Sequence, residues 1–305
     1  MERREFIRMT GAGSAGVLMT SAGFTTKKRI SGLTVKDINH YLRSLIEVRE
    51  PSVDRIVIGN PDMEVKKIGT AWMPYWKTLK SAHERGVNVM VVHEPAFYTH
   101  WDLDADTWDY YDAPTPAREN YFDLRDKKKA WLEDKHMAII RCHDVLDKIP
   151  EWGIPFAFGQ AMGFENKDII RSKTYYNIYG IETKPAIEVA REIAGKLKSL
   201  NQPGVAFYGD ENRPVSSVGL GTGCISDPLD YAELEPDMYI SIDDAVQTWT
   251  QTTYAEDSGK PLVVVNHGTS EEAGARSLNR HLKTVYPDID VIHFNEGCTY
   301  RFINP

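Results

Sequence analysis

Hydrophobic residues along this chain either recur at three- and four-residue intervals or gather in short uninterrupted runs. The recurring spacing indicates helices with one apolar face, and the short runs are typical of strands buried on both faces. We expect helices over residues 34–47, 74–85, 124–135, 184–199 and 271–285. We expect strands over residues 54–59, 67–73, 87–92, 137–142, 216–220, 238–242 and 262–266. This alternation predicts an α/β protein in two layered halves, residues 31–165 and 166–305, each with a mixed sheet flanked by helices.

Residues 98–122 break this rhythm, because they are rich in Trp, Tyr, Asp and Pro and show no period. A loop of that length is usually functional or disordered. Its aromatic residues Trp101, Trp108, Tyr110 and Tyr111 follow closely after a predicted strand. We expect the loop to form a lid or rim that selects a planar substrate, and packing at a subunit interface is an equally open interpretation.

The first residues have the features of a targeting signal. Arg3 and Arg4 are followed by Phe6, Ile7 and a weakly apolar stretch, which resembles a twin-arginine export signal over residues 1–30. That route carries folded proteins, so we expect the mature chain in the periplasm or another extracytoplasmic space. If the segment is only a basic tail, the protein is cytoplasmic.

Composition narrows the classes of partner. With 305 residues, 42% of them hydrophobic, the chain can bury a sizeable core. The net charge is −8, and acidic and basic residues are mixed along its length without a basic stripe. We therefore expect no nucleic-acid partner. Beyond residue 30 no apolar run is long enough to span a membrane. The three cysteines form no CxxC pair, and we expect no disulfide framework.

Candidate chemistry lies where predicted strands end, since ligands of open α/β sheets collect at the carboxyl ends of strands. Three strands are each followed by a histidine and a carboxylate: His93 with Glu94, His143 with Asp147, and His267 with Glu271. Imidazole nitrogen and carboxylate oxygen are ligands of zinc, manganese and iron, and a carboxylate can bridge two ions. The pattern therefore predicts a site for two metal ions.

Each residue also has a structural explanation. Glu271 would lie in the first turn of the last predicted helix, where the helix dipole favours a carboxylate, and Thr269 with Glu272 would form a capping box. His143 would then be a buried, hydrogen-bonded histidine, and His93-Glu94 the start of a solvated loop. The three pairs together, rather than any one of them, favour the metal site.

Four stretches of the sequence resemble a known family. They are GNPDMEVKKI with VMVVHEPAFY, CHDVLDKIPEWGIPFAFGQAMGF, SSVGLGTGCISD and VVVNHGTSEEAGARSLNRHL. They are similar to motifs of the dinuclear metal-centre hexameric family named for NGG-one-interacting factor three, whose members often carry the name GTP cyclohydrolase one type two. The resemblance runs from Thr34 to the C-terminus. It implies a homo-oligomer, expected to be a hexameric ring.

The resemblance also implies roles for individual residues. His93 would bind one metal, Asp147 would bridge both, and His267 and Glu271 would complete the two coordination spheres. His143 matches a histidine beside the site, which implies proton transfer or support of a ligand rather than coordination. The sequence departs from the family in having Glu94 for a second histidine, Asn266 for a glycine, a longer loop at 98–122 and no Trp-Asp-Asn-rich segment near the first strand.

These features favour a metal-dependent hydrolase of a small molecule, for which we expect a nucleotide- or pterin-like compound. Two divalent ions sharing a water lower its pKa towards neutrality and create hydroxide. Glu94 makes the ligand set harder and tilts it towards manganese or iron relative to zinc. Two further classes stay open: a non-catalytic metal-binding or oligomeric scaffold protein of the cell envelope, and a solute-binding protein.

Overall fold

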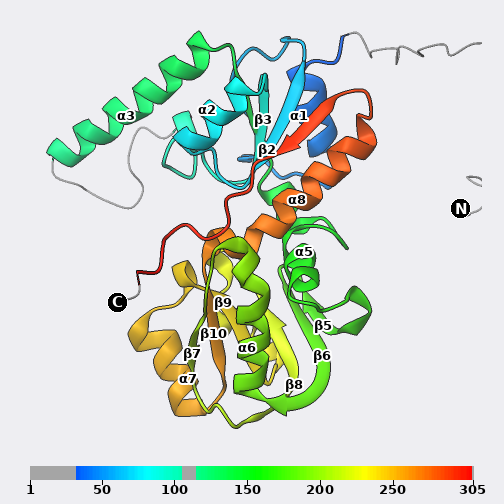
Figure 1. Cartoon of the computed structure of the whole chain (residues 1–305), viewed down its shortest axis with the longest axis vertical. Coiled ribbons are helices and arrows are strands. Elements are labelled where there is room, and N and C mark those ends of the chain that lie inside the picture. Colours follow the sequence, from blue (N-terminus) through cyan, green and yellow to red (C-terminus); the bar gives the residue numbers. More distant parts are fainter. Residues whose placement is uncertain (1–31, 105–114, 304–305) are drawn as a thin grey trace, which may run out of the picture.

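The computed structural model describes residues 32–104 and 115–303, and Figure 1 shows the chain in two stacked parts. The predicted export signal at 1–30 lies outside the described residues. Among the described helices, none combines the length and the apolar character needed to cross a membrane. The predicted fold class is confirmed, because the chain forms two mixed sheets with helices packed on them.

The first sheet has five strands in the order β1-β4-β3-β2-β11. They are β1 (Ile56–Ile58), β2 (Lys67–Ala71), β3 (Val89–Val92), β4 (Ala138–Arg141) and β11 (Asp290–His293). Only β1 runs antiparallel to its neighbour, and the other pairings are parallel. The carboxyl ends of β3 and β4 therefore meet at one edge of the sheet.

Helices cover both faces of this sheet, which explains why its strands read as continuous apolar runs. The helices are α1 (Val35–Arg43), α2 (Trp76–Glu84) and α3 (Thr115–Asp134), with α8 (His267–Val285) from the end of the chain. Val91 of β3 packs with Ile38 of α1 and Leu282 of α8 on one face. Its neighbour Val92 faces the other way, towards Leu79 of α2.

The second sheet has six strands in the order β5-β6-β8-β9-β10-β7. They are β5 (Ile169–Lys173), β6 (Tyr176–Pro185), β7 (Ala206–Tyr208), β8 (Pro214–Leu220), β9 (Met238–Ile242) and β10 (Leu262–Val265). Strands β8, β9 and β10 are parallel, and the flanking pairings are antiparallel. The helices of this part are α5 (Ile154–Ala161), α6 (Ala186–Leu197) and α7 (Thr253–Ser258), with the short α4 (Asp144–Lys148) preceding α5.

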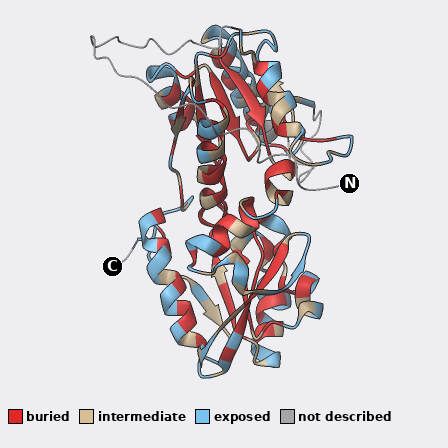
Figure 2. Ribbon diagram, turned by 90° about the vertical axis from the view of Figure 1, so that its right-hand side faces the viewer, coloured by how far each residue is buried: buried red, intermediate tan, exposed pale blue. Residues whose placement is uncertain are grey.

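Helix α8 connects the two parts. It begins directly after β10 of the second sheet, and it packs against the first sheet further along, where Figure 2 shows it buried along much of its length. Gly274 allows α5 to cross it closely, because a Cβ there would lie 2.3 Å from Cγ1 of Ile154 and 3.0 Å from its Cα. The chain then returns to the first sheet, where β11 pairs with β2.

Two sequence expectations are corrected here. Helix α3 begins at Thr115 rather than near 124, so residues 115–122 are helical and not part of a loop. Pro116 made this start hard to predict. Proline is nevertheless tolerated in the first turn of a helix, because a backbone N–H there would have no acceptor within the helix. The half predicted at 166–305 also does not hold together as one unit, because β11 belongs to the first sheet.

Candidate metal centre

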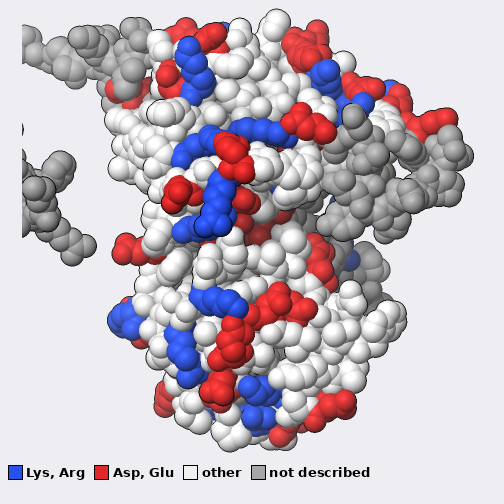
Figure 3. Space-filling model, turned by 180° about the vertical axis from the view of Figure 1, so that it is seen from behind, with Lys and Arg blue, Asp and Glu red and all other residues white. Residues whose placement is uncertain are grey.

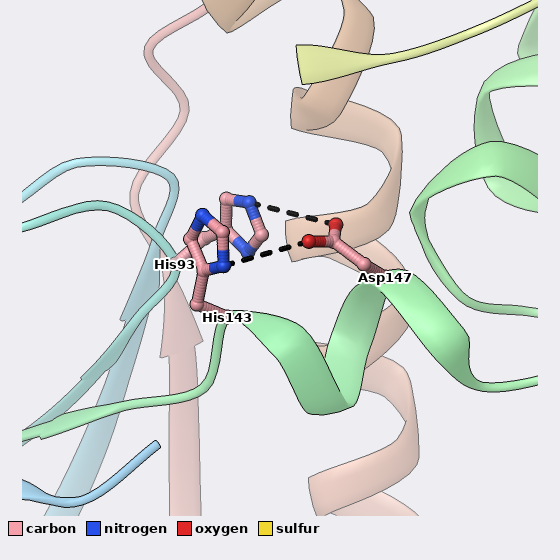
Figure 4. A group of neighbouring side chains, drawn as sticks. All are labelled: His93, His143 and Asp147. Carbon is pink, nitrogen blue, oxygen red and sulfur yellow. Dashed lines mark ion pairs between the residues drawn. The ribbon is translucent and has the colours of Figure 1, made fainter. Parts of the chain in front are cut away.

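Two neighbouring strands of the first sheet deliver half of the predicted site. His93 and Glu94 follow β3, and His143 follows β4, with Asp147 one helical turn later on α4. Because β3 and β4 are parallel partners, these side chains meet at the same sheet edge. Figure 4 shows the rings of His93 and His143 side by side, with the Asp147 carboxylate facing both. The two rings are stacked, with centroids 4.4 Å apart and planes 8° apart.

Helix α8 delivers the other half. It begins at His267, so Glu271 lies one turn later on the same face of the helix. The expected start at 271 and the Thr269–Glu272 capping box are wrong: both residues lie inside α8 and are buried. The true start has the weak helix formers Gly268 and Thr269 in its first turn. A tertiary contact compensates, because the His267 amide donates to Asp243 Oδ1 at 3.0 Å.

The two halves meet around the Glu271 carboxylate. Its Oε2 lies 3.2 Å from Nε2 of His93 and 3.0 Å from Nε2 of His267. Glu94 Oε1 lies 3.2 Å from the same His267 nitrogen. Asp147 lies further away, with Oδ1 3.8 Å from His93 Nε2. Two groups of residues could each hold a metal ion, because the ligand atoms within each group lie within 4.8 Å of one another. One group is His93, His143 and Asp147, and the other is His93, Glu94 and Glu271.

In His93 and His267, the ring nitrogen that faces away from the site, Nδ1, has an oxygen acceptor nearby. Nδ1 of His93 lies 3.3 Å from the carbonyl oxygen of Cys142, and Nδ1 of His267 lies 2.7 Å from Asp244 Oδ2. With Nδ1–H donating to these oxygens, each Nε2 faces the site and offers a lone pair to a metal ion once its own proton has left. Both Nε2 atoms are buried and form no hydrogen bond among the described residues, although carboxylate oxygens lie 3.0 to 3.2 Å from them. This is the arrangement in which protein histidines coordinate metals.

The charges of the site favour a bound cation. Burial by itself lowers the pKa of His93, but Glu271 and Asp147 outweigh it and raise that pKa to about 9. The pKa of His267 is raised well above its usual range by Glu271 and Asp244, against the effect of burial. Burial raises the pKa of Asp147 to about 6. Without a metal ion, the carboxylates therefore favour protons on the two histidines, at the positions where a metal ion would bind.

Sequence reasoning missed three residues that support the cluster. Asp244 follows the carboxyl end of β9, so the rule that ligands collect at the carboxyl ends of strands points to it as well. Trp72 follows β2, is buried, and donates from Nε1 to Glu271 Oε2 at 2.7 Å. Gly223 has φ +64°, and a Cβ there would lie 2.7 Å from Glu271 Oε1. It lies in the GTGC stretch that carried part of the family resemblance.

A pocket of about 1000 Å³ opens beside Glu94 and His267. Six aromatic side chains contribute to its wall: Trp72, Tyr75, Trp76, Tyr98, Tyr121 and Tyr300. Tyr98 and Tyr121 come from the segment predicted to select the substrate, whereas Trp101 packs against His100 and is absent from the lining. Trp108, Tyr110 and Tyr111 lie outside the described residues.

The sequence profile of the Duf34/NIF3 (NGG1p interacting factor 3) family matches residues 116–297, more than half of the chain. The chain belongs to the NIF3 family. Asp147, His267 and Glu271 lie within the matched segment, whereas His93 and Glu94 precede it. No curated protein matches the sequence.

Solved structures share the NIF3 fold at low sequence identity. The Staphylococcus aureus hypothetical protein SA1388 is 18% identical with a TM-score of 0.68, covering 88% of this chain and 99% of its own. A Bacillus cereus protein related to NIF3 is 12% identical with a TM-score of 0.67, covering 90% and 99%. Reduced HcgD from Methanocaldococcus jannaschii is 20% identical with a TM-score of 0.61, covering 86% and 97%. These likenesses show the fold.

Proposed function

We propose that this NIF3-family chain binds two divalent cations between its two sheets and hydrolyses a small molecule held in the adjacent aromatic pocket. The observation that carries the proposal is the pair of buried Nε2 atoms, on His93 and His267, without hydrogen-bond partners and facing buried carboxylates. Lone pairs directed at carboxylate oxygens repel each other unless a proton or a metal ion lies between them.

The donor set fits two ions of moderate hardness. Among the described residues, the ligand atoms that come together are nitrogen and oxygen, which suits manganese, iron or zinc. The carboxylates of Glu94, Asp147 and Glu271 together carry three negative charges against four positive charges on two divalent ions. One positive charge is left for an anionic oxygen of a substrate or of water. Divalent ions in such a site supply Lewis acidity and lower the pKa of bound water.

The residues of the chain would bind, orient and move protons. Asp244 holds His267 in one orientation, and Trp72 fixes one oxygen of Glu271. His143 is partly exposed and its Nδ1 lies 3.5 Å from Asp147 Oδ2, so it can carry a proton between the site and solvent. The aromatic side chains provide flat surfaces for a planar ring. The structure supports the binding of metal by burial and geometry, and hydrolysis is our inference from that chemistry.

Hydrolysis is tested with manganese-loaded protein and a substrate panel that includes GTP, a pterin with a cyclic amide, and phosphate esters. We expect turnover that is abolished by chelation and reduced at least about a hundredfold in Asp147→Asn. Asp257→Asn, on the distant helix α7, is the matched control and should keep full activity. Stoichiometric metal with no turnover of any compound in the panel would refute hydrolysis and leave a metal-binding protein without catalysis.

A further inference from the structure

A buried lysine lines the aromatic pocket away from the metal cluster. Tyr121, Leu124 and Lys128 are three and four residues apart on α3, so they share one face of the helix, and all three line the pocket. Lys128 is only 4% exposed, whereas lysine is rarely buried in proteins unless it is paired. Its position therefore calls for an explanation.

Neutral groups hold the ammonium of Lys128. Nζ donates to the carbonyl oxygens of Pro74 at 2.6 Å and Ala96 at 2.7 Å, and it lies 5.3 Å from the centre of the Tyr98 ring. An ammonium has three hydrogens, and the third has no acceptor among the described residues. No described carboxylate forms a salt bridge with it. Burial lowers the pKa of Lys128 to about 8 against the opposing charges of Asp102 and Glu296, neither of which forms a salt bridge with it, and at that pKa the side chain is still charged at neutral pH.

Positive and negative charges lie on different residues of the pocket wall. Lys128 is the only lysine or arginine among the described residues that line it, and Glu94, Asp243 and Asp244 place negative charge on the side of the cluster. An unpaired buried charge is costly, and a ligand anion beside the ammonium would remove that cost. The aromatic side chains of the same pocket suit a ring rather than a flexible chain.

We propose that Lys128 recognises an anionic group on a ring-bearing ligand and thereby positions that ligand with its opposite end towards Glu94 and His267. This deepens the proposed function, on which its catalytic consequence rests, because it assigns the substrate to the class of planar aromatic anions. Ligand binding itself requires no turnover. It is therefore measurable whether or not the protein proves to be a hydrolase.

A purely structural role for Lys128 makes a different prediction. Its two hydrogen bonds connect α3 to the segments at Pro74 and Ala96, and both of these residues line the pocket. If that were its whole role, removing the ammonium would loosen the pocket for charged and uncharged ligands alike. An anion-recognising role weakens the binding of the charged ligand alone.

The test compares naphthalene-2-sulfonate with naphthalene-2-sulfonamide, which have the same ring and differ in charge. Sulfonate is a poor metal ligand, whereas a primary sulfonamide can bind a metal ion through its nitrogen, so the ratio is taken from the metal-free protein. Dissociation constants are measured by calorimetry on the full-length protein with and without manganese. The variants are Lys128→Met and Lys128→Arg, with Lys127→Met as the control, since Lys127 is exposed and pairs with Asp123 on the same helix.

We expect the parent to bind the sulfonate about tenfold more tightly than the sulfonamide, in line with one charge-assisted hydrogen bond. Lys128→Met should bring that ratio to about one without weakening the sulfonamide, and Lys127→Met should leave it unchanged. Lys128→Arg should retain part of the preference. A ratio near one in the parent, an equal loss for both ligands in Lys128→Met, or no binding of either ligand would each overturn the proposal. Failure to find metal would refute the proposed function and leave this ratio intact.

Discussion

Oε2 of Glu271 lies 3.0 Å from Nε2 of His267, the residue one turn earlier on α8. The same oxygen lies 3.2 Å from Nε2 of His93, which follows β3 in the other sheet. One carboxylate thus lies between histidines from the two parts of the molecule. Sequence comparison assigned the bridging role to Asp147, and that role stays a prediction. The present geometry makes Glu271 a second candidate for the bridge.

Glu271→Gln should therefore weaken metal binding at both positions. It removes one negative charge from a buried site while keeping the shape of the side chain and an oxygen for the Trp72 bond. We expect the affinity for manganese to fall at least about tenfold, as for loss of an important ligand interaction. Equilibrium dialysis measures it, with Glu188→Gln on the surface of α6 as the control. Equal metal content in parent and variant would show that Glu271 is not a ligand.

Asp244→Ala should weaken metal binding although Asp244 is not itself a proposed ligand. Asp244 accepts the Nδ1 hydrogen of His267 and so keeps Nε2 directed at the site. Loss of such a supporting carboxylate typically costs about ten- to a hundredfold in affinity. Titration with manganese measures the effect, and Asp257→Ala provides the control. An unchanged affinity would mean that packing, including the contact of His267 with Trp72, is enough to orient the ring.

Metal binding should release protons and weaken in acid. The pKa of His93 is about 9 without metal, so near pH 7.5 its ring is protonated and must lose that proton to coordinate. The pKa of Asp147 is about 6, so as the pH falls through that value its carboxylate becomes protonated and the affinity falls further. Calorimetry in buffers of different ionisation enthalpy counts the released protons. An affinity independent of pH between about 5.5 and 7.5 would contradict this assignment.

The aromatic wall should bind ring-containing ligands independently of the metals. Tyr98 and Tyr300 line the pocket and are 44% and 46% exposed, so replacing both with alanine leaves the core intact. Aromatic pairs contribute roughly 0.5 to 1.5 kcal/mol each, so the double variant should bind naphthalene-2-sulfonamide about tenfold more weakly. Metal content should stay unchanged. Trp249→Ala, exposed and outside the pocket, is the control. No loss of affinity would place the ring elsewhere.

Much of the site could be predicted because it follows a simple rule. Val87 to Val92 form an apolar run, and the rule that ligands collect at strand ends drew attention to His93 and Glu94. The same rule applied to β9 would have found Asp244. Trp72 could not be found in this way, because its role depends on a contact with Glu271, 199 positions later in the chain.

The rest of the fold escaped prediction where tertiary contacts override local preference. Strand β11 is short and pairs with β2 at the opposite end of the chain, so no local signal placed it in the first sheet. The start of α8 at His267 depends on Asp243, which satisfies its amide. Figure 3 shows acidic and basic side chains intermixed over the face it displays, a pattern that the mixed charges of the sequence anticipate. Export and assembly into a ring stay predictions.

The most direct test of the account is the metal content of the parent protein. The full chain is expressed in medium supplied with manganese, iron and zinc, purified without chelators, and measured by elemental analysis. We expect about two metal ions per chain, with less in His267→Ala and no change in Asp257→Ala. Less than about one ion per chain in the parent would contradict the dinuclear site and, with it, the function proposed for this pocket.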